Sequence, residues 1–295
     1  MRDQTNGWTK HVSSDDASVN WTRPTPDGGL LEARYVRRTD EYFIAYVSSH
    51  SGCRHACRFC HLTQTGQTMF RETPIEEIYE QFGKVIEHYD ALKAPADRVN
   101  INFMARGEPL SNADLTRRFG TLSDWIRADC EMRDIGAMFN ISSIFPQDSA
   151  GIDLARAFRG APVTIFWSLY SLDPRFRRRW LPRAQEPQMI RDRLLAWQEA
   201  TGGKVVLHWA LIDGQNDDAE SLGEIHDFIA VSGLDARLNL VRYNTHSAKT
   251  GSEAAIERYE DALKIIGDVM TVSGSRIVPR VGFDVNASCG MFMSV

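Results

Sequence analysis

Residues 51–66 read SGCRHACRFCHLTQTG, and this stretch holds three of the five cysteines of the chain. Cys53, Cys57 and Cys60 follow C-x3-C-x2-C spacing, so one loop can wrap three thiolates around a single inorganic centre. A structural zinc site normally takes four protein ligands, and His61 could supply the fourth. An iron–sulfur cubane held by three cysteines would instead leave one iron open to a further ligand. Both metal centres remain possible on spacing alone.

The segments on either side of the cysteines predict the fold. A β-rich run at 42–49 (YFIAYVSS) precedes them, and further strands are predicted at 99–105, 137–142, 163–169, 204–212, 236–243 and 275–280. Helical patterns lie between these strands at 75–92, 113–128, 152–158, 189–201, 219–233 and 253–270. Such alternation is typical of parallel strands joined by crossover helices. We therefore predict an α/β fold, a partial TIM-like (β/α)6 barrel with the cysteine loop at the carboxyl end of its first strand, where such barrels carry their chemistry.

The chain divides into three predicted parts. Residues 1–40 form a short N-terminal extension, irregular apart from one strand at LLEARYV (30–36). Residues 41–281 form the core barrel, and residues 282–295 form a C-terminal tail that carries Cys289. At the start of the first long helix, Thr73 and Glu76 have the spacing of a capping box. Cys130 falls at the end of a helical pattern, where a buried structural thiol is expected.

Composition limits the classes of function. The net charge is −5 and 43% of the residues are hydrophobic, as in an ordinary folded protein rather than one with a wholly basic surface. The N-terminus lacks an apolar signal region and no long uncharged apolar run appears, so we predict no membrane association. An odd number of cysteines, with three clustered, indicates reduced thiols and a cytoplasmic location.

One segment is strongly basic. PRFRRRWLPR, at 174–183, combines two aromatic residues with five arginines, namely Arg175, Arg177, Arg178, Arg179 and Arg183. These side chains could hold phosphates and stack on bases of an RNA or nucleotide substrate. The alternative is a solvated basic helix start, and the sequence favours neither interpretation.

Several motifs in a fixed order resemble one known family. The cysteine spacing after a first strand, with Phe59 before the last cysteine, resembles the radical SAM superfamily. Further along stand NFMARGEPLSN (102–112), FNISSIFP (139–146), SLYSLDPRFRRRWLP (168–182), IDGQND (212–217), NLVRYN (239–244) and GFDVNASCG (282–290). Together they are similar to the RlmN and Cfr family, radical SAM enzymes that methylate adenosine carbons in RNA.

The resemblance implies cofactors and roles for particular residues. Cys53, Cys57 and Cys60 would bind a [4Fe-4S] cluster, and S-adenosylmethionine (SAM) would be held by Phe59, Gly107, Glu108, Ser142, Ser168 and Asn244. One SAM would methylate Cys289. A second SAM would supply the radical that takes hydrogen from that S-methyl group, and the resulting carbon radical would add to the base. Glu32 matches a family glutamate near the adenine, and an electron donor such as flavodoxin or ferredoxin is implied.

The chain also departs from this family. Tyr46 stands where the family has a second catalytic cysteine, and Tyr170 replaces the histidine of the SLHA motif. Only residues 1–40 precede the barrel, where the family carries an RNA-binding accessory domain. These differences predict a divergent relative whose substrate is a smaller RNA, a nucleotide or another metabolite. The five arginines favour a phosphate-bearing substrate.

Three functions follow from these patterns. The leading one is a methyl synthase that acts on an adenine-containing RNA or nucleotide through methylated Cys289. The first alternative is a radical SAM enzyme that abstracts hydrogen directly from a different small molecule or peptide. The second is a non-catalytic zinc-binding protein that uses Cys53, Cys57, Cys60 and His61.

Overall fold

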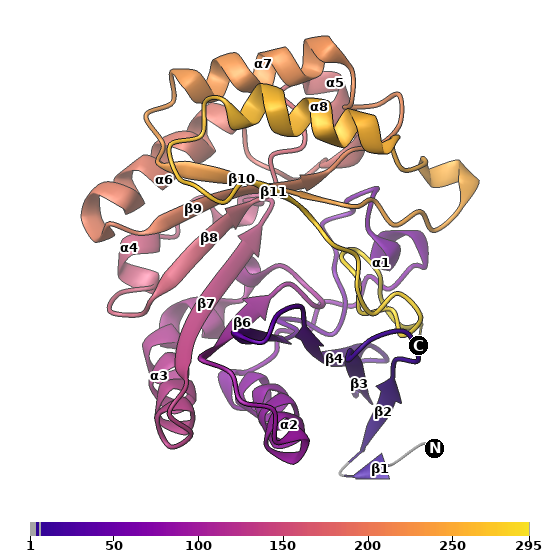
Figure 1. The fold of residues 1–295 in the computed structure, drawn as a ribbon, viewed down its shortest axis with the longest axis vertical. Helices are drawn as coiled ribbons and strands as arrows, with labels where there is room; N and C mark the ends of the chain where they lie inside the picture. The colour runs from indigo at the N-terminus through magenta and orange to yellow at the C-terminus, as the bar shows by residue number, and fades with distance from the viewer. Residues whose placement is uncertain (1–3, 6, 295) are drawn as a thin grey trace.

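A single sheet organises the molecule. The computed structural model describes residues 4, 5 and 7–294, and its eleven strands follow one another in sequence order (Figure 1). The strands are β1 (Gln4–Thr5), β2 (Trp8–Val12), β3 (Val19–Pro24), β4 (Leu30–Arg37), β5 (Tyr42–Tyr46), β6 (Arg98–Phe103), β7 (Gly136–Ser143), β8 (Val163–Trp167), β9 (Lys204–Ala210), β10 (Ala236–Val241) and β11 (Arg276–Val278).

Strands β5 to β11 form the parallel half. Their crossovers contain α1 (His61–Gln64), α2 (Ile75–Leu92), α3 (Ala113–Glu131), α4 (Leu154–Ala157), α5 (Pro174–Trp180), α6 (Pro187–Thr201), α7 (Ala219–Ala230) and α8 (Ile256–Gly267), with 3-10 turns at Pro109–Ser111, Gln147–Ser149 and Ala248–Thr250. The long helices cover the outer face of the sheet (Figure 1), and β8 is buried along its whole length, as a parallel strand covered on both faces should be. The predicted partial (β/α)6 barrel is confirmed.

The barrel is open between its first and last parallel strands. Within the described residues, β5 is hydrogen-bonded to β4 and β6 but not to β11. The C-terminal tail crosses this opening: Figure 1 shows it running from β11 to the side of β3 and β4. Val281 packs there against Val36, Tyr42 and Ile44. The tail therefore closes the side of the barrel that lacks strand pairing.

The N-terminal extension is more regular than predicted. Beside the expected strand at β4, strands β1, β2 and β3 add to the sheet, and each neighbouring pair from β1 to β5 is antiparallel. Strand β3 alternates apolar and polar residues over VNWTRP, and Val19 and Trp21 are buried. This pattern is short and interrupted by polar turns, which explains why the sequence shows only one strand.

The predicted capping box at the start of α2 is wrong. Helix α2 begins after Pro74, and no side chain of its own caps it. Asp114 of α3 instead accepts a hydrogen bond from the Ile75 amide (3.0 Å), and Glu76 pairs with Arg118 (2.5 Å). A neighbouring helix thus supplies the cap that the local sequence was expected to supply. No helix among the described residues has the length and apolar character needed to cross a membrane.

Candidate active site

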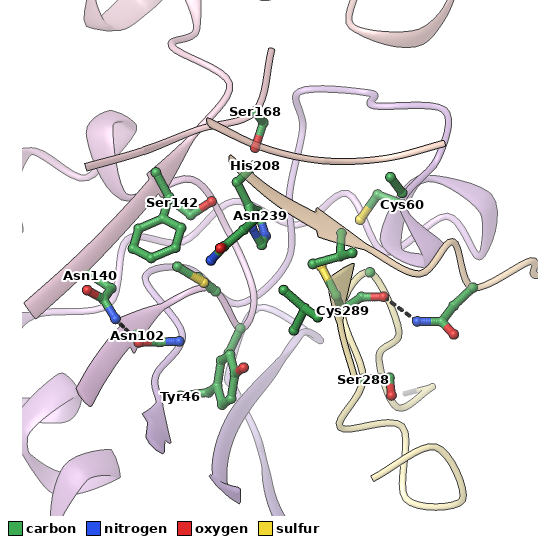
Figure 2. A pocket seen from close by; sticks show the side chains of 18 of the residues that line it. Tyr46, Cys60, Asn102, Asn140, Ser142, Ser168, His208, Asn239, Ser288 and Cys289 are labelled. Atoms are coloured by element: carbon green, nitrogen blue, oxygen red, sulfur yellow. Dashed lines mark hydrogen bonds between the residues drawn. The ribbon is translucent and has the colours of Figure 1, made fainter. Parts of the chain in front are cut away.

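A cavity of about 230 Å³ opens at the carboxyl ends of the parallel strands. Every strand from β5 to β11 contributes to its lining, together with the cysteine loop and the C-terminal tail (Figure 2). The predicted site residues that line it are Cys53, Cys57, Phe59, Cys60, Gly107, Glu108, Ser142, Ser168, Asn244 and Cys289. Side chains far apart in the sequence are therefore brought to one space. Glu32 does not line this cavity.

The cysteine loop folds tightly onto the segment that follows it. The Cys53 amide donates to the Gln67 carbonyl (3.1 Å), and the Cys60 amide donates to the Cys57 carbonyl (3.1 Å). A Cβ added at Gly52 would lie 2.6 Å from the Gln67 carbonyl oxygen, so only glycine fits there. Ala56 has a left-handed φ of 57°, an uncommon conformation for a residue with a side chain. Local backbone geometry thus presents the three thiols to the cavity.

The three thiols are free and close enough to influence one another. Burial raises the pKa of Cys53 and of Cys57 well above the ordinary thiol value, and the neighbouring cysteines raise each pKa further. Burial also raises the pKa of Cys60 to about 11. Thiols in such a site become thiolates when a positive metal centre is present to compensate the charge. The donor set fits a bound iron–sulfur cluster.

The geometry gives little support to a zinc site. His61 Nε2 is hydrogen-bonded to the carbonyl of Asn244 (2.9 Å), and burial lowers the pKa of His61. In residues 4, 5 and 7–294, no group of three or more His, Cys, Asp and Glu side chains is arranged around one metal ion. A zinc ion needs its ligands to converge on a point, whereas each cysteine of a cubane binds a different iron. The described residues therefore offer no preformed site for a single zinc ion.

The GEP turn places a carboxylate beside the cysteines. Gly107 has φ 99°, and an added Cβ would lie 2.5 Å from His50 Nδ1, so this turn requires glycine. Glu108 is buried and accepts hydrogen bonds from the amides of Leu110 and Ile144 (both 3.2 Å). Burial raises the pKa of Glu108 to about 7, although these hydrogen bonds act in the opposite direction. Glu108 is thus placed to receive a cationic amino group.

The remaining predicted SAM contacts come from neighbouring strand ends. Ser142 of β7 and Ser168 after β8 face the cavity in Figure 2. Phe59 stacks on Tyr170 with ring centroids 4.3 Å apart. Asn244 donates through Nδ2 to the Cys289 carbonyl (2.8 Å), while its Oδ1 is buried and has no partner among the described residues. Asn244 therefore links the predicted SAM site to the tail.

Cys289 is exposed and lines the cavity. The backbone on its C-terminal side is fixed, because the His61 amide donates to the Gly290 carbonyl (3.1 Å). Desolvation by the enclosing protein raises the pKa of the Cys289 thiol, and the positive charges of Arg34 and Arg38 partly oppose this increase. The tail thus holds this thiol in the same cavity as the three cysteines of the loop (Figure 2).

A buried ionic cluster holds the tail in place. We define the tail clamp as Glu32, Arg34 and Arg106. Arg34 donates to the carbonyl of Met291 (2.7 Å), Arg106 donates to the carbonyl of Met293, and the Met293 amide donates to Glu32 Oε1 (2.9 Å). The Phe292 ring lies against both guanidinium groups, 5.0 Å from Arg34 and 5.8 Å from Arg106. The clamp therefore fixes the residues immediately after Cys289.

Glu32, for which the resemblance implied a place near the adenine, lies in the tail clamp and not in the lining of the cavity. Its side chain is fully buried, and its carboxylate is 2.5 Å from Arg34 and 2.9 Å from Arg106. Burial alone would raise the pKa of Glu32, but the two guanidinium groups outweigh burial and hold the pKa below its usual value. Asn20 also donates to the same carboxylate (3.2 Å). Among the described residues, the carboxylate of Glu32 thus bonds to two arginines, to Asn20 and to the tail.

Tyr46 lies at the carboxyl end of β5 and lines the same cavity as Cys289 (Figure 2). Its hydroxyl is hydrogen-bonded to Arg38. Cys130 is buried within α3, as expected for a structural thiol. Neither residue supplies a second thiol at the mouth of the cavity.

The five arginines of the basic segment divide into two groups. Arg177 is buried in α5 and donates to the carbonyls of Leu169, Ser171 and Gln185, so it holds a loop together. The exposed members of the segment are Arg175, Arg178, Arg179 and Arg183. Asp173 caps the helix by accepting from the amides of Arg175 and Phe176. The prediction that the basic segment contacts a phosphate-bearing substrate is thus wrong for Arg177. For the four exposed arginines it stays a prediction.

Sequence reasoning missed the polar interior of the barrel. Asn102, Asn140, His208 and Asn239 lie on four different strands and line the cavity (Figure 2). Asn140 Nδ2 donates to Asn102 Oδ1 (2.7 Å). The signal was present as alternation, since VNINF at 99–103 places its asparagines on one face of β6. The alternation predicted a strand but not that its polar face points inward.

Comparison with known proteins agrees with this arrangement. No family model matches the chain. The chain is 28% identical to the dual-specificity RNA methyltransferase RlmN of Helicobacter hepaticus, an alignment that covers 94% of this chain and 75% of that protein. It is 30% identical to the probable dual-specificity RNA methyltransferase RlmN of Frankia alni, covering 95% of this chain and 65% of that protein.

A solved structure shares the fold. A radical SAM methyltransferase from Sphaerobacter thermophilus matches with a TM-score of 0.80 over 97% of this chain and 81% of that one, at 22% identity. The chain is thus a homologue of proteins named RlmN over most of its length and has a radical SAM methyltransferase fold. The family resemblance predicted from the motifs is confirmed.

Proposed function

We propose, from its homology to RlmN-type radical SAM methyltransferases, that this chain is a radical SAM methyl synthase that uses Cys289 as a methyl carrier. Cys53, Cys57 and Cys60 bind a [4Fe-4S] cluster in this proposal. The observation that carries it is the convergence of these three thiols and Cys289 on one cavity, although more than 220 residues separate Cys60 from Cys289. No local motif would bring a fourth thiol there by itself.

The residues around the cavity have separate roles in this proposal. When bound, the cluster and SAM supply an electron, a methyl group and a 5′-deoxyadenosyl radical. Glu108 accepts hydrogen bonds from the amino group of SAM, and Ser142, Ser168 and Asn244 orient the rest of the molecule. Cys289 accepts the methyl group through its sulfur, which must first lose its proton. The positive charges of Arg34 and Arg38 favour that loss.

The substrate in this proposal is an adenine-containing RNA or nucleotide. The relatives named RlmN are described as RNA methyltransferases, which supports a nucleic-acid or nucleotide substrate. The exposed arginines of the basic segment follow β8 and are available to phosphates. A flavodoxin or ferredoxin supplies the electron, and the reaction takes place in the cytoplasm. Glu32 positions the tail and makes no contact with the base.

Anaerobic reconstitution of the cluster with SAM and dithionite tests the proposal. Formation of 5′-deoxyadenosine measures SAM cleavage, and the mass of the peptide that contains Cys289 measures methyl transfer. We expect 5′-deoxyadenosine to form, and a methyl increment on Cys289 before any substrate is added. Protein that holds one zinc and lacks iron and sulfide would contradict the whole proposal.

The same measurements distinguish the proposed function from its main alternative. An enzyme that abstracts hydrogen directly from another substrate cleaves SAM but leaves Cys289 unmodified. The position of Cys289 in the cavity, with its own carbonyl bonded to Asn244 and the Gly290 carbonyl bonded to His61, favours the methyl-carrier role. A Cys289→Ala variant that methylates its substrate at the wild-type rate would rule that role out.

A further inference from the structure

The cavity has a pronounced excess of positive charge. Its lining contains six arginines, namely Arg34, Arg38, Arg237, Arg242, Arg276 and Arg280. Among the lining residues that the structure describes, Glu108 is the one acidic side chain. A cavity with this balance attracts anions.

Half of these arginines have a carboxylate partner. Arg34 pairs with Glu32, and Arg242 and Arg280 both pair with Glu253. In the described ranges, Arg38, Arg237 and Arg276 form no ion pair with a carboxylate, in contrast to the three that do. Their positive charges are therefore uncompensated by the protein.

The three unpaired arginines lie together at the amino ends of the parallel strands. Arg38 is in the turn between β4 and β5, Arg237 is the second residue of β10, and Arg276 begins β11, where it is paired with Asn239 of β10. Tyr42 interacts electrostatically with both Arg38 and Arg237. Burial lowers the pKa of Arg237, and the like charge of Arg276 lowers it further. We call the three arginines and Tyr42 the lumen floor.

Polar groups without partners line the same cavity as the lumen floor and Cys289. Asn239 is only 4% exposed, and its Oδ1 has no hydrogen-bond partner among the described residues. His208 Nδ1 and Arg38 Nε are likewise buried without a partner there. Burial, followed by the charge of Arg38, lowers the pKa of His208 to about 4, so the ring is neutral at pH 7. Figure 2 shows Asn239 and His208 side by side in the middle of the cavity.

Buried polar groups without partners are rare in native proteins, because each one costs free energy. Arg38 and Arg237 are partly buried, and Arg276 is exposed where it lines the cavity. A guanidinium group that is partly removed from water is stabilised when an anion accepts its hydrogen bonds. The planar guanidinium group matches the paired oxygens of a phosphate or a carboxylate. The unsatisfied groups here are hydrogen-bonding sites for a ligand with an anionic end and a polar body.

We propose that the barrel interior binds an anionic substrate, with its phosphate or carboxylate on Arg38, Arg237 and Arg276 and its polar body against His208 and Asn239. The ligand then reaches from the lumen floor toward Cys289, since one continuous cavity includes both. The role of the bound anion as a substrate rests on the proposed function, whereas the binding of an anion at this site does not. It names the substrate as a small anion-bearing molecule held inside the barrel.

Equilibrium dialysis of the anaerobic holoenzyme with saturating SAM tests the site. The probes are AMP, adenosine, adenosine-5′-carboxylic acid, inorganic phosphate and a short RNA with a central adenosine. We expect AMP or the carboxylic acid to bind at least tenfold more tightly than neutral adenosine, and the tighter of the two identifies the anion. If the RNA binds and loses affinity in the variants below, the phosphate comes from a polynucleotide and the small-molecule assignment is overturned.

The variants are Arg38→Gln and Arg237→Gln, with Arg117→Gln as the matched control. Arg117 is exposed on α3, far from the residues that line the cavity. Each lumen variant should weaken binding of the anionic probe by about tenfold or more and leave adenosine unchanged. Because neither arginine has a carboxylate to leave unpaired, both variants should fold, and their melting temperatures will confirm it.

The inference is overturned if no anionic probe binds more tightly than adenosine, or if the lumen variants bind every probe as the control does. The mass of Cys289, measured in the same samples, keeps the two proposals distinct. Selective anion binding without methylated Cys289 would contradict the methyl-carrier role and support the anion site. Methylated Cys289 without selective anion binding would support the methyl-carrier role and contradict the anion site.

Discussion

The cysteine loop and the C-terminal tail bring thiols to the same cavity, but they are held in opposite ways. The loop is fixed by nearby backbone, as in the bonds from Cys53 to Gln67 and from Gln67 to Leu62. Residues 282–294 of the tail form no helix or strand, and side chains from segments far away in the sequence hold them. Local geometry is therefore sufficient for a cluster site, whereas the position of Cys289 depends on a buried ionic cluster.

The largest expected difference between the two regions is in SAM cleavage. Cys57→Ala removes a ligand from the loop, so we expect complete loss of 5′-deoxyadenosine formation in the reconstituted enzyme. Cys289→Ala leaves the loop intact, so cleavage should persist while methyl transfer is lost. Cys130→Ala is the control, because its buried thiol lies in α3 and should change neither reaction. Equal losses of cleavage in the Cys57 and Cys289 variants would contradict the division of roles.

Removing the charge of the clamp should release the tail and leave the loop in place. Glu32→Gln leaves two buried arginines without their carboxylate, which typically costs about 3–5 kcal/mol of folding free energy. Urea unfolding measures this loss. We also expect alkylation of Cys289 to accelerate by about tenfold or more, a change of about 1.4 kcal/mol in the equilibrium for tail opening.

A second variant separates tail release from general instability. Deletion of residues 291–295 removes the backbone groups that the clamp binds but retains Cys289 and Glu32. Alkylation of Cys289 should again accelerate, with Cys130 as the internal reference. If both variants leave the alkylation rate of Cys289 unchanged, the clamp does not position the tail.

Acid should weaken the clamp only below the ordinary carboxyl range. The pKa of Glu32 in the folded protein lies below its ordinary value of 4.5, because Arg34 and Arg106 outweigh burial. The contribution of Glu32 is thus fully present above the unfolded-state pKa and is lost as the pH falls through the folded-state pKa. The stability difference between wild type and Glu32→Gln should be constant from about pH 7 to pH 5.5 and shrink below about pH 4.5. A difference that shrinks already near neutral pH would refute the ionised clamp.

The smallest expected effect comes from the tyrosine that faces the tail. Tyr46→Cys introduces a second thiol into the cavity that Cys289 lines, and we expect turnover or release of a trapped adduct to increase a few-fold, a difference of about 1 kcal/mol or less. Tyr46→Phe is the control, since it removes the hydroxyl bonded to Arg38 without adding a thiol. An unchanged rate in Tyr46→Cys would indicate that this chain resolves its intermediate without a disulfide.

The sequence determined the elements whose information is local. Alternating strand and helix patterns predicted the parallel half of the sheet, because hydrophobic periodicity reflects which face of each element is buried. The spacing of Cys53, Cys57 and Cys60 predicted their loop because the local backbone alone can bring three ligands within eight residues to one place. The motif order predicted the relationship to RlmN proteins that the comparisons confirm.

Only the tertiary structure decided what the charged and polar residues do. Glu32 and Arg177 look solvated in the sequence, but the fold buries both and uses their charges to hold backbone carbonyls or arginines. Arg38 looks no different from Arg37, yet its side chain enters the cavity without a carboxylate partner in the described chain. The physical reason is that the energy of a charge depends on its partners and on its distance from water, and both are set by residues far away in the sequence.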